Sequence, residues 1–316
     1  MRAYIARRLL AMLATLLGVS LIVFGLMRLI PGTVVEQLLG QSALVGEETI
    51  RSLRQFFGLD RPWYVQYGEW LAGIARGDLG MSWRSHRPVL QLIAARLPVS
   101  AELAVLAVAW SLLLGVPLGA LAAVRRGRAS DSVVRFASTL GLSVPAFWQG
   151  TLLILLFSVY LEWMPFLQWV PLTRDPLGNL AIVALPALTL GTATAAMISR
   201  MTRSAMLDVL GRDYIRTARA KGASERRVLA IHALRNALIP VVTVAGVQMG
   251  YILGGIVVVE DVFNLPGVGR LLLDAIFQRD YPVVQGTILV GAALFMGLNF
   301  LVDLLYAVID PRITYA

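Results

Sequence analysis

The chain has 316 residues, of which 58% are hydrophobic and only 15% are charged, and its mean hydropathy is +0.73. A soluble domain carries about 25% charged residues, so this composition excludes an ordinary water-soluble particle. It predicts an all-α integral membrane protein with a lipid-facing apolar exterior. The chain has no cysteine, which excludes disulfides, and with only His86 and His232 a His-rich metal site is not expected.

Six apolar stretches are each long enough to cross the hydrocarbon core, which takes about 20 residues. They are Leu9–Ile30, Ser100–Val124, Val133–Leu161, Leu180–Ser199, Ala237–Val259 and Val283–Ile309. The first follows Arg7 and Arg8 and is longer than the apolar core of a signal peptide, so we expect it to be retained. Pro117, Pro145 and Pro186 fall inside spans, where neighbouring helices can satisfy the carbonyls that they free.

Basic residues predict the orientation of these spans, because they gather at both termini, after the second span, and between the fourth and fifth spans. They are Arg2, Arg7, Arg8, Arg125, Arg126, Arg128, Arg200, Arg203, Arg212, Arg216, Arg219, Lys221, Arg226, Arg227, Arg235 and Arg312. Since Lys and Arg are enriched in cytoplasmic loops, both termini are expected to be cytoplasmic. The net charge of +9 then reflects topology, and nucleic-acid binding is not expected.

This topology divides the chain into four parts. They are the N-terminal end and first span (1–30), an extracytoplasmic loop (31–98), the core of spans two to six (99–309) and a cytoplasmic tail (310–316). The outer loop is expected to form three short helices, at residues 47–57, 62–75 and 88–96. These helices would either cap the bundle from outside or contact a substrate.

The stretch 206–236, between the fourth and fifth spans, is the most informative. Asp213–Ala220 has a short helix pattern, Gly222 interrupts it, and a second helix begins at Glu225 with Ser224 as its N-cap. Small residues at the turn would let another surface approach closely: Ala218, Ala220, Gly222 and Ala223. From the residues alone, docking of a partner and contact with anionic lipid are equally compatible with this pattern.

Residues 213–222 read Asp-Tyr-Ile-Arg-Thr-Ala-Arg-Ala-Lys-Gly, and residues 232–240 read His-Ala-Leu-Arg-Asn-Ala-Leu-Ile-Pro. This pattern resembles the coupling loop of ATP-binding-cassette import permeases, and more specifically the first permease subunit of dipeptide, oligopeptide and nickel importers. Further segments match in order along the chain: Leu29–Gly32, Gly58–Pro62, Arg76–Gly80, Val259–Arg270, Arg279–Pro282 and Asp310–Arg312. The chain departs from the family pattern at Thr217, where Glu is usual, and at Thr33, where Asp is usual.

The resemblance implies a type I importer permease fold with six transmembrane helices and a cytoplasmic coupling helix, in the bacterial cytoplasmic membrane. It implies a half-channel that pairs with a homologous second permease subunit, two ATPase subunits and an extracytoplasmic solute-binding protein. The residues that it assigns to coupling with the ATPase are Asp213, Tyr214, Thr217, Ala218, Arg219, Ala220, Lys221, Gly222 and Ala223. The sequence has no Gly-x-x-x-x-Gly-Lys-Ser/Thr loop, so ATP and Mg²⁺ are expected on partner subunits, with no cofactor or catalytic residue in this chain.

Candidate pathway or gate residues lie in the last two spans and in the region between them. They are Gln248, Glu260, Asp261, Pro266, Gly267, Asn299 and Asp303. Polar groups at membrane depth are costly, and Asn299 and Asp303 share a helix face, where they either join helices by hydrogen bonds or line the path. Asn264–Gly269 is expected to be a tight turn, acting either as a gate or as a plain connection. A close-packing face is expected in the fifth span from its glycines: Gly246, Gly250, Gly254 and Gly255.

Two cargoes and two other protein classes compete with this interpretation. Phe157–Trp163 resembles the nickel branch of the family, whereas Asp175–Leu180 is similar to the peptide branch, and peptides are favoured. A stand-alone channel would not need the helix–turn–helix at 206–236. A membrane-embedded enzyme would need an acid, base or nucleophile constellation at one depth, which the sequence does not display. The expected function is therefore a permease subunit for di- or oligopeptides that a solute-binding protein delivers.

Overall fold

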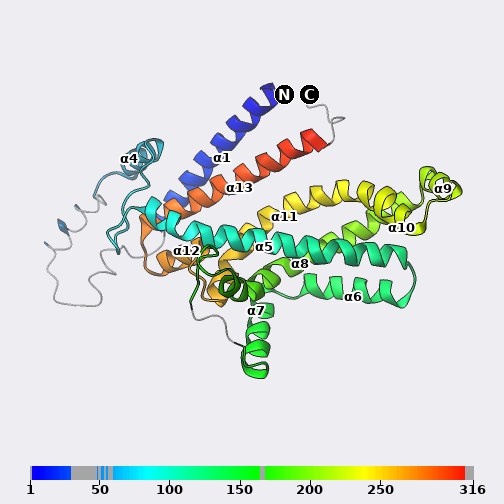
Figure 1. Cartoon of the computed structure of the whole chain (residues 1–316). Coiled ribbons are helices and arrows are strands. Elements are labelled where there is room, and N and C mark those ends of the chain that lie inside the picture. Colours follow the sequence, from blue (N-terminus) through cyan, green and yellow to red (C-terminus); the bar gives the residue numbers. More distant parts are fainter. Residues whose placement is uncertain are drawn as a thin grey trace. The chain divides into compact units, whose positions relative to one another are not determined.

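The computed structural model describes residues 2–29, 60–163 and 168–309, together with 48, 51, 52 and 55. Within these ranges the protein is helical and contains no β-strand, and a single bridge pairs Met81 with Pro88. The described residues form two compact units, whose elements Figure 1 labels. Unit 1 contains the described residues up to Pro98 together with Gly267–Gly297. Unit 2 contains the described residues of Val99–Pro266 and those from Leu298 on. The predicted tail at 310–316 and most of the predicted helix at 47–57 lie outside the described residues.

Among the described residues, five helices are long and apolar enough to cross a membrane. They are α1 (Arg2–Leu29), α5 (Val89–Val124), α8 (Pro176–Leu210), α11 (Arg235–Val262) and α13 (Tyr281–Ile309). Each contains or largely overlaps one predicted span, so five of the six predictions are confirmed. With a rise of about 1.5 Å per residue, α5 and α8 are each more than about 50 Å long, well beyond the hydrocarbon thickness of about 30 Å.

The third predicted span is wrong as a continuous helix. α6 (Ala129–Ser143) ends directly before Val144, and α7 (Ala146–Leu155) with the π-helical turn η1 (Leu156–Tyr160) continues at an angle of 104° to it. Pro145 causes the break, because proline disfavours the helical conformation in the residue before it, and Val144 is extended at φ −85° and ψ 122°. The two arms make a sixth span only when they are counted together.

Of the short helices predicted in the outer loop, the one at residues 62–75 is confirmed and the one at residues 88–96 is wrong as a separate helix. α4 (Trp63–Ala75) starts after Pro62, as predicted, and the chain leaves it through Gly77 at φ +81°. The short helix predicted at 88–96 is not a separate element, because it forms the first turns of α5 and runs on without a break. Pro117 and Pro186 lie inside continuous helices, as predicted.

Unit 1 joins α4 and a short hairpin-like loop to the ends of longer helices. The Tyr67 hydroxyl on α4 lies 2.9 Å from that of Ser20 on α1, and the Phe24 ring meets Tyr67 edge to face. The loop that contains the Met81–Pro88 bridge is held by Asp280, directly before α13. This carboxylate is 4% exposed and accepts hydrogen bonds from the Ser82 hydroxyl at 2.5 Å and the Trp83 amide at 3.1 Å.

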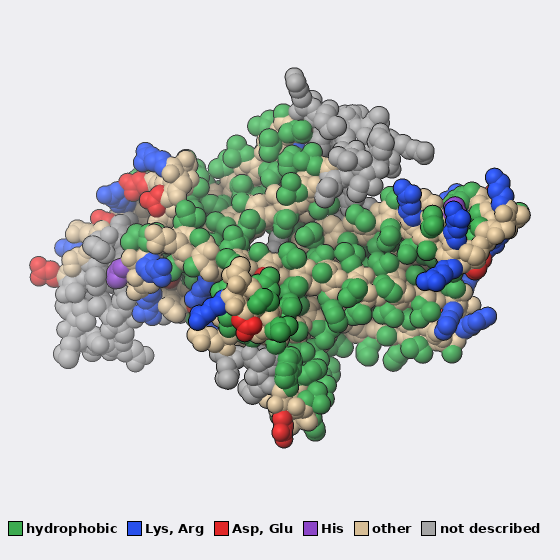
Figure 2. All heavy atoms as spheres, in the orientation of Figure 1, with side chains coloured by type: hydrophobic (Ala, Val, Ile, Leu, Met, Phe, Trp, Pro, Cys, Tyr) green, Lys and Arg blue, Asp and Glu red, His purple; other side chains and the backbone are tan. Residues whose placement is uncertain are grey.

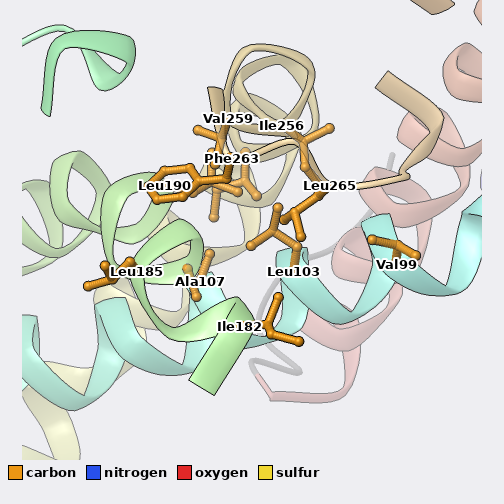
Figure 3. Packing of buried hydrophobic residues seen from close by; sticks show 12 residues of the cluster. Val99, Leu103, Ala107, Ile182, Leu185, Leu190, Ile256, Val259, Phe263 and Leu265 are labelled. Carbon is orange, nitrogen blue, oxygen red and sulfur yellow. The ribbon is translucent and has the colours of Figure 1, made fainter. Parts of the chain in front are cut away.

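Unit 2 is built around α8, which packs against α6, α7 and α11. Figure 3 shows the main core, where apolar side chains of α5, α8 and α11 meet. Its buried members are Val99, Leu103, Ala107, Ile182, Leu185, Ala187, Leu190, Ile252, Ile256, Val259, Phe263 and Leu265. The N-terminus of α8 is capped by the Asp175 carboxylate, which accepts from the Gly178 amide at 3.0 Å, with Pro176 in the first turn.

Glycines let α5 and α8 approach each other closely. A Cβ on Gly119 would lie 2.4 Å from the Ser199 carbonyl oxygen, and one on Gly191 would lie 2.7 Å from the Ala107 oxygen. Small residues of this kind allow backbone contact between membrane helices. Of the glycines predicted to pack closely in α11, Gly255 does so, because its Cβ would lie 3.1 Å from Leu190 Cδ1 of α8, whereas a Cβ on Gly254 would meet nothing within 4 Å.

Gly119→Ala is expected to destabilise the protein, because the new methyl group would clash with backbone of α8 that cannot move alone. Overpacking of this kind costs about 1–3 kcal/mol, which should lower the unfolding midpoint of the detergent-purified protein by several degrees. Gly18→Ala in α1 is the matched control, since its Cβ would meet nothing within 4 Å. Equal midpoints for the two variants would contradict the close packing of α5 on α8.

Candidate functional site

α9 (Asp213–Ala220) is the short helix predicted in the loop between the fourth and fifth spans, and its bounds agree with the prediction. Only two residues separate it from α8, and a turn at Gly222 leads into α10 (Glu225–Arg227) and the π-helical η2 (Val228–Leu234). α11 follows directly, so α9 is tied at both ends to long helices (Figure 1). π-Helical turns inside α-helices are rare and occur frequently at functional sites.

One side chain anchors α9. Ile215 is 0% exposed and is the only buried residue of this helix. It packs in a cluster formed by residues of α5, α8, η2 and α11: Ala123, Ala205, Met206, Val228, Ala233 and Ala237. α9 is therefore packed against three long helices and is not held by its connecting residues alone.

The Tyr214 side chain adds a polar attachment. Its hydroxyl accepts a hydrogen bond from the Asn236 side-chain nitrogen at 3.1 Å and lies 3.5 Å from the His232 carbonyl oxygen. The same Asn236 nitrogen donates to the His232 oxygen at 2.8 Å. This set of contacts fixes the first turn of α9 to the end of η2 and the start of α11.

A Schellman motif closes the other end of α9. The Ala223 amide donates to the Ala218 oxygen at 3.2 Å, and the Gly222 amide donates to the Arg219 oxygen at 2.9 Å. This motif places Gly222 in the left-handed region, at φ +81°. The sequence thus predicted the turn correctly, whereas Ser224 occupies the N-cap position without a side-chain capping hydrogen bond.

An ion pair spans this turn. The Arg219 guanidinium donates to both carboxylate oxygens of Glu225, at 3.1 and 2.7 Å, and this hydrogen bonding raises the pKa of Arg219. The two-point geometry holds α9 at a set angle to α10. Both side chains are largely exposed, so the pair orients the turn more than it stabilises the fold.

Most of the predicted coupling residues face outward. Exposed are Asp213, Tyr214, Thr217, Arg219, Ala220, Lys221 and Gly222, whereas Ala218 and Ala223 are half-buried. Figure 2 shows Lys and Arg side chains gathered over α9 and α10, while hydrophobic side chains cover the visible faces of the long helices of unit 2. The structure therefore brings the nine residues together as one surface of small and basic groups on a firmly anchored helix.

The candidate gate residues lie at the end of α11. Glu260 is 0% exposed and accepts a hydrogen bond from the Ser100 hydroxyl of α5 at 2.5 Å, whereas Asp261 is exposed. The predicted turn is shorter than expected, because α12 (Val268–Phe277) already begins one residue after Gly267. Pro266 is half-buried in this turn, and Gly267 is buried directly before α12.

The other candidates lie within helices, and one was missed. Gln248 on α11 and Asn299 and Asp303 on α13 are half-buried, which leaves helix joining and path lining open for them. Sequence reasoning passed over Glu102 in α5, although a carboxylate inside an apolar span is a strong signal. Its Oε1 atom is buried and has no hydrogen-bond partner in the described part of the chain. Those same ranges contain no group of three or more metal-ligating side chains.

Comparison with known proteins gives matches over the whole chain. Residues 115–315 match the family model "Binding-protein-dependent transport system inner membrane component", and residues 1–104 match the model of the corresponding N-terminal region. The dipeptide transport system permease protein DppB of Escherichia coli (strain K12) is 42% identical over 338 residues, covering 100% of this chain and 99% of that protein.

A second relative and a solved structure extend the comparison. The di/tripeptide transport system permease protein DppB of Pseudomonas aeruginosa (strain UCBPP-PA14) is 43% identical over 335 residues, with 100% and 99% coverage. A solved chain of an amino acid ABC transporter aligns with a TM-score of 0.47 and 15% identity, over 71% of this chain and 95% of that one. From the family match and these two relatives, the chain belongs to the family of binding-protein-dependent transport system inner membrane components.

Proposed function

We propose that this chain is the permease subunit of an ATP-driven importer and forms half of the translocation pathway for di- or oligopeptides. The observation that carries the proposal is α9, an exposed helix of small and basic residues that Ile215 anchors to long apolar helices. A rigid helix of this kind transmits a displacement from a docked partner into the helices that it joins. Membership of the binding-protein-dependent transport family supports the same function.

Peptides are the proposed cargo rather than nickel. The two curated relatives described above are named as dipeptide and di/tripeptide permeases, and each aligns over the whole of this chain. Sequence similarity over the full length is a reason to expect related cargo. A nickel complex, the alternative cargo considered from the sequence, appears in the name of neither relative, and uptake measurements distinguish the two cargoes.

The proposed assembly contains a homologous second permease subunit, two ATPase subunits that hold ATP and Mg²⁺, and an extracytoplasmic solute-binding protein. This chain would then be a multi-pass protein of the bacterial inner membrane with both termini in the cytoplasm. That orientation puts the basic surface of α9 and α10 on the cytoplasmic side of the membrane. Lys and Arg are enriched on this side, and the ATPase subunits would bind there. In this arrangement the chain itself catalyses no reaction.

Purification and reconstitution test the proposed function. The chain, expressed with its neighbouring subunits, is expected to co-purify with ATPases, and the reconstituted complex should take up labelled dipeptide only with ATP and the binding protein. Uptake of nickel but not dipeptide would transfer the proposal to the second cargo. Isolation without ATPases, together with transport that needs no ATP, would instead indicate a stand-alone channel.

The gate role of Glu260 is part of this proposal, because its hydrogen bond with Ser100 joins α5 to α11. Ser100→Ala is expected to weaken this junction, since a lost hydrogen bond to a buried carboxylate costs about 1–3 kcal/mol. The reconstituted complex should then hydrolyse ATP several-fold faster without binding protein. Val258→Ala is the control, because this α11 side chain is exposed and its truncation should leave that rate unchanged. An unchanged rate in Ser100→Ala would contradict a gate at this position.

A further inference from the structure

A second polar junction of unit 2 lies away from α9 and Glu260. Arg203 on α8 donates from Nε to one oxygen of Asp131 at 2.8 Å and from Nη2 to the other at 2.9 Å. The Asp131 side chain is 2% exposed and that of Arg203 is 23% exposed. The Gly127 amide, in the loop before α6, donates to the same carboxylate at 3.0 Å. This junction is therefore buried, charged and bonded at three points.

The pair joins the start of α6 to α8, and α6 also packs on α8 toward its other end, where a Cβ on Gly141 would lie 3.3 Å from Thr192 Cγ2. Besides Asp131, the only buried residues of α6 are Val134 and Ser138, and many of its apolar side chains are exposed. In lipid, apolar surface provides no hydrophobic driving force for helices to associate, so contacts between them depend on close packing and polar bonds. The ion pair is the charged, hydrogen-bonded contact that holds this end of α6 against α8.

The position of Arg203 connects the pair with α9. From Arg203 to its end at Leu210, α8 continues as helix for about two turns, and α9 begins after two further residues. The same segment of α8 packs tightly on α5, because a Cβ on Gly119 would lie 3.1 Å from the Arg203 amide nitrogen. A displacement of α9 therefore reaches Arg203 through continuous helix before it can reach α6.

We propose that Asp131 and Arg203 form a clamp that makes α6 follow α8 when α9 is displaced. This inference rests on the proposed function, and it makes both side chains positioning residues for transport. Without the clamp, α8 would still move with α9, but the start of α6 would no longer be held to α8 during that movement. The ATPase cycle would then run without delivering its full movement to the membrane helices.

Coupling ratios test the clamp in the full reconstituted complex. Asp131→Asn and Arg203→Gln are each expected to lower the peptide transported per ATP hydrolysed at least fivefold, with complex assembly retained. Arg135→Gln is the matched control, because Arg135 also approaches Asp131, at 3.4 Å, but its side chain is 56% exposed. The ratio of peptide transported to ATP hydrolysed in Arg135→Gln should stay within twofold of that of the unchanged chain. An unchanged ratio in the first two variants, or a parallel loss of assembled complex and both activities, would overturn the proposal.

A distance measurement separates the clamp from the proposed function. The chain has no cysteine, so Ala137→Cys on α6 and Asp208→Cys on α8, both exposed, give it two spin-label sites. With Asp131 present, the distribution of distances between the two spin labels should be narrow, and it should be the same with and without ATP. In Asp131→Asn this distribution should broaden. A distribution that stays as narrow as in the unchanged chain would overturn the clamp. A complex that fails to transport peptides yet shows this difference would refute the proposed function alone.

Discussion

Ile215→Ala is expected to release α9 from the long helices and to lower ATP-driven uptake at least tenfold. The side chain is fully buried and is the only buried one of its helix. Truncation of a buried Ile to Ala costs about 2–5 kcal/mol, and an isolated helix of eight residues is not stable in water. Membrane insertion should be unaffected, because the long apolar helices do not depend on this contact.

Limited trypsin digestion measures the release directly, since α9 carries Arg216 and Arg219, and cleavage after them requires local unfolding of the helix. Cleavage between α8 and α10 should become at least tenfold faster in Ile215→Ala. Ile231→Ala is the matched control, because it removes the same atoms from a side chain in η2 that is 50% exposed. Equal cleavage rates and equal uptake in the two variants would show that Ile215 does not anchor α9.

Local features of the chain were predictable where local chemistry determines them. The bounds of α9 follow from its helix pattern and from Gly222, because a Schellman motif requires a left-handed residue at that position. The apolar stretches located five spans for the same reason, since length and hydropathy are properties of the sequence alone. Ile215, by contrast, has no signal beyond being an aliphatic residue in a polar helix.

Contacts between distant residues were not predictable from one sequence. The Asp131–Arg203 pair joins residues 72 apart, and the Ser100–Glu260 hydrogen bond joins residues 160 apart, so no spacing rule connects them. The bend at Pro145 was missed for another reason. The apolar character of the sequence continues across it, and a membrane protein can accommodate a proline either within a helix or at a break between two helices. Packing, and not composition, decides between a kink and a break.

Gly222→Val is expected to lower uptake at least tenfold while the protein still inserts and accumulates normally. At φ +81° a residue with a Cβ costs about 1–2 kcal/mol, and a β-branched one more, so the turn would open and the Arg219–Glu225 pair would lose its geometry.

The contrast with the glycine at the other end of α9 makes this prediction specific. Gly211 has φ −81°, a right-handed conformation, and its Cβ would lie 3.6 Å from the nearest atom, the Asp208 oxygen. Gly211→Ala should therefore transport normally. The peptide transported per ATP, measured in the reconstituted complex, distinguishes the two glycines. If Gly222→Val keeps the normal ratio, a set angle between α9 and α10 is not required for coupling. If both variants lose transport equally, any side chain added at a glycine beside α9 is harmful, and backbone conformation does not explain the loss.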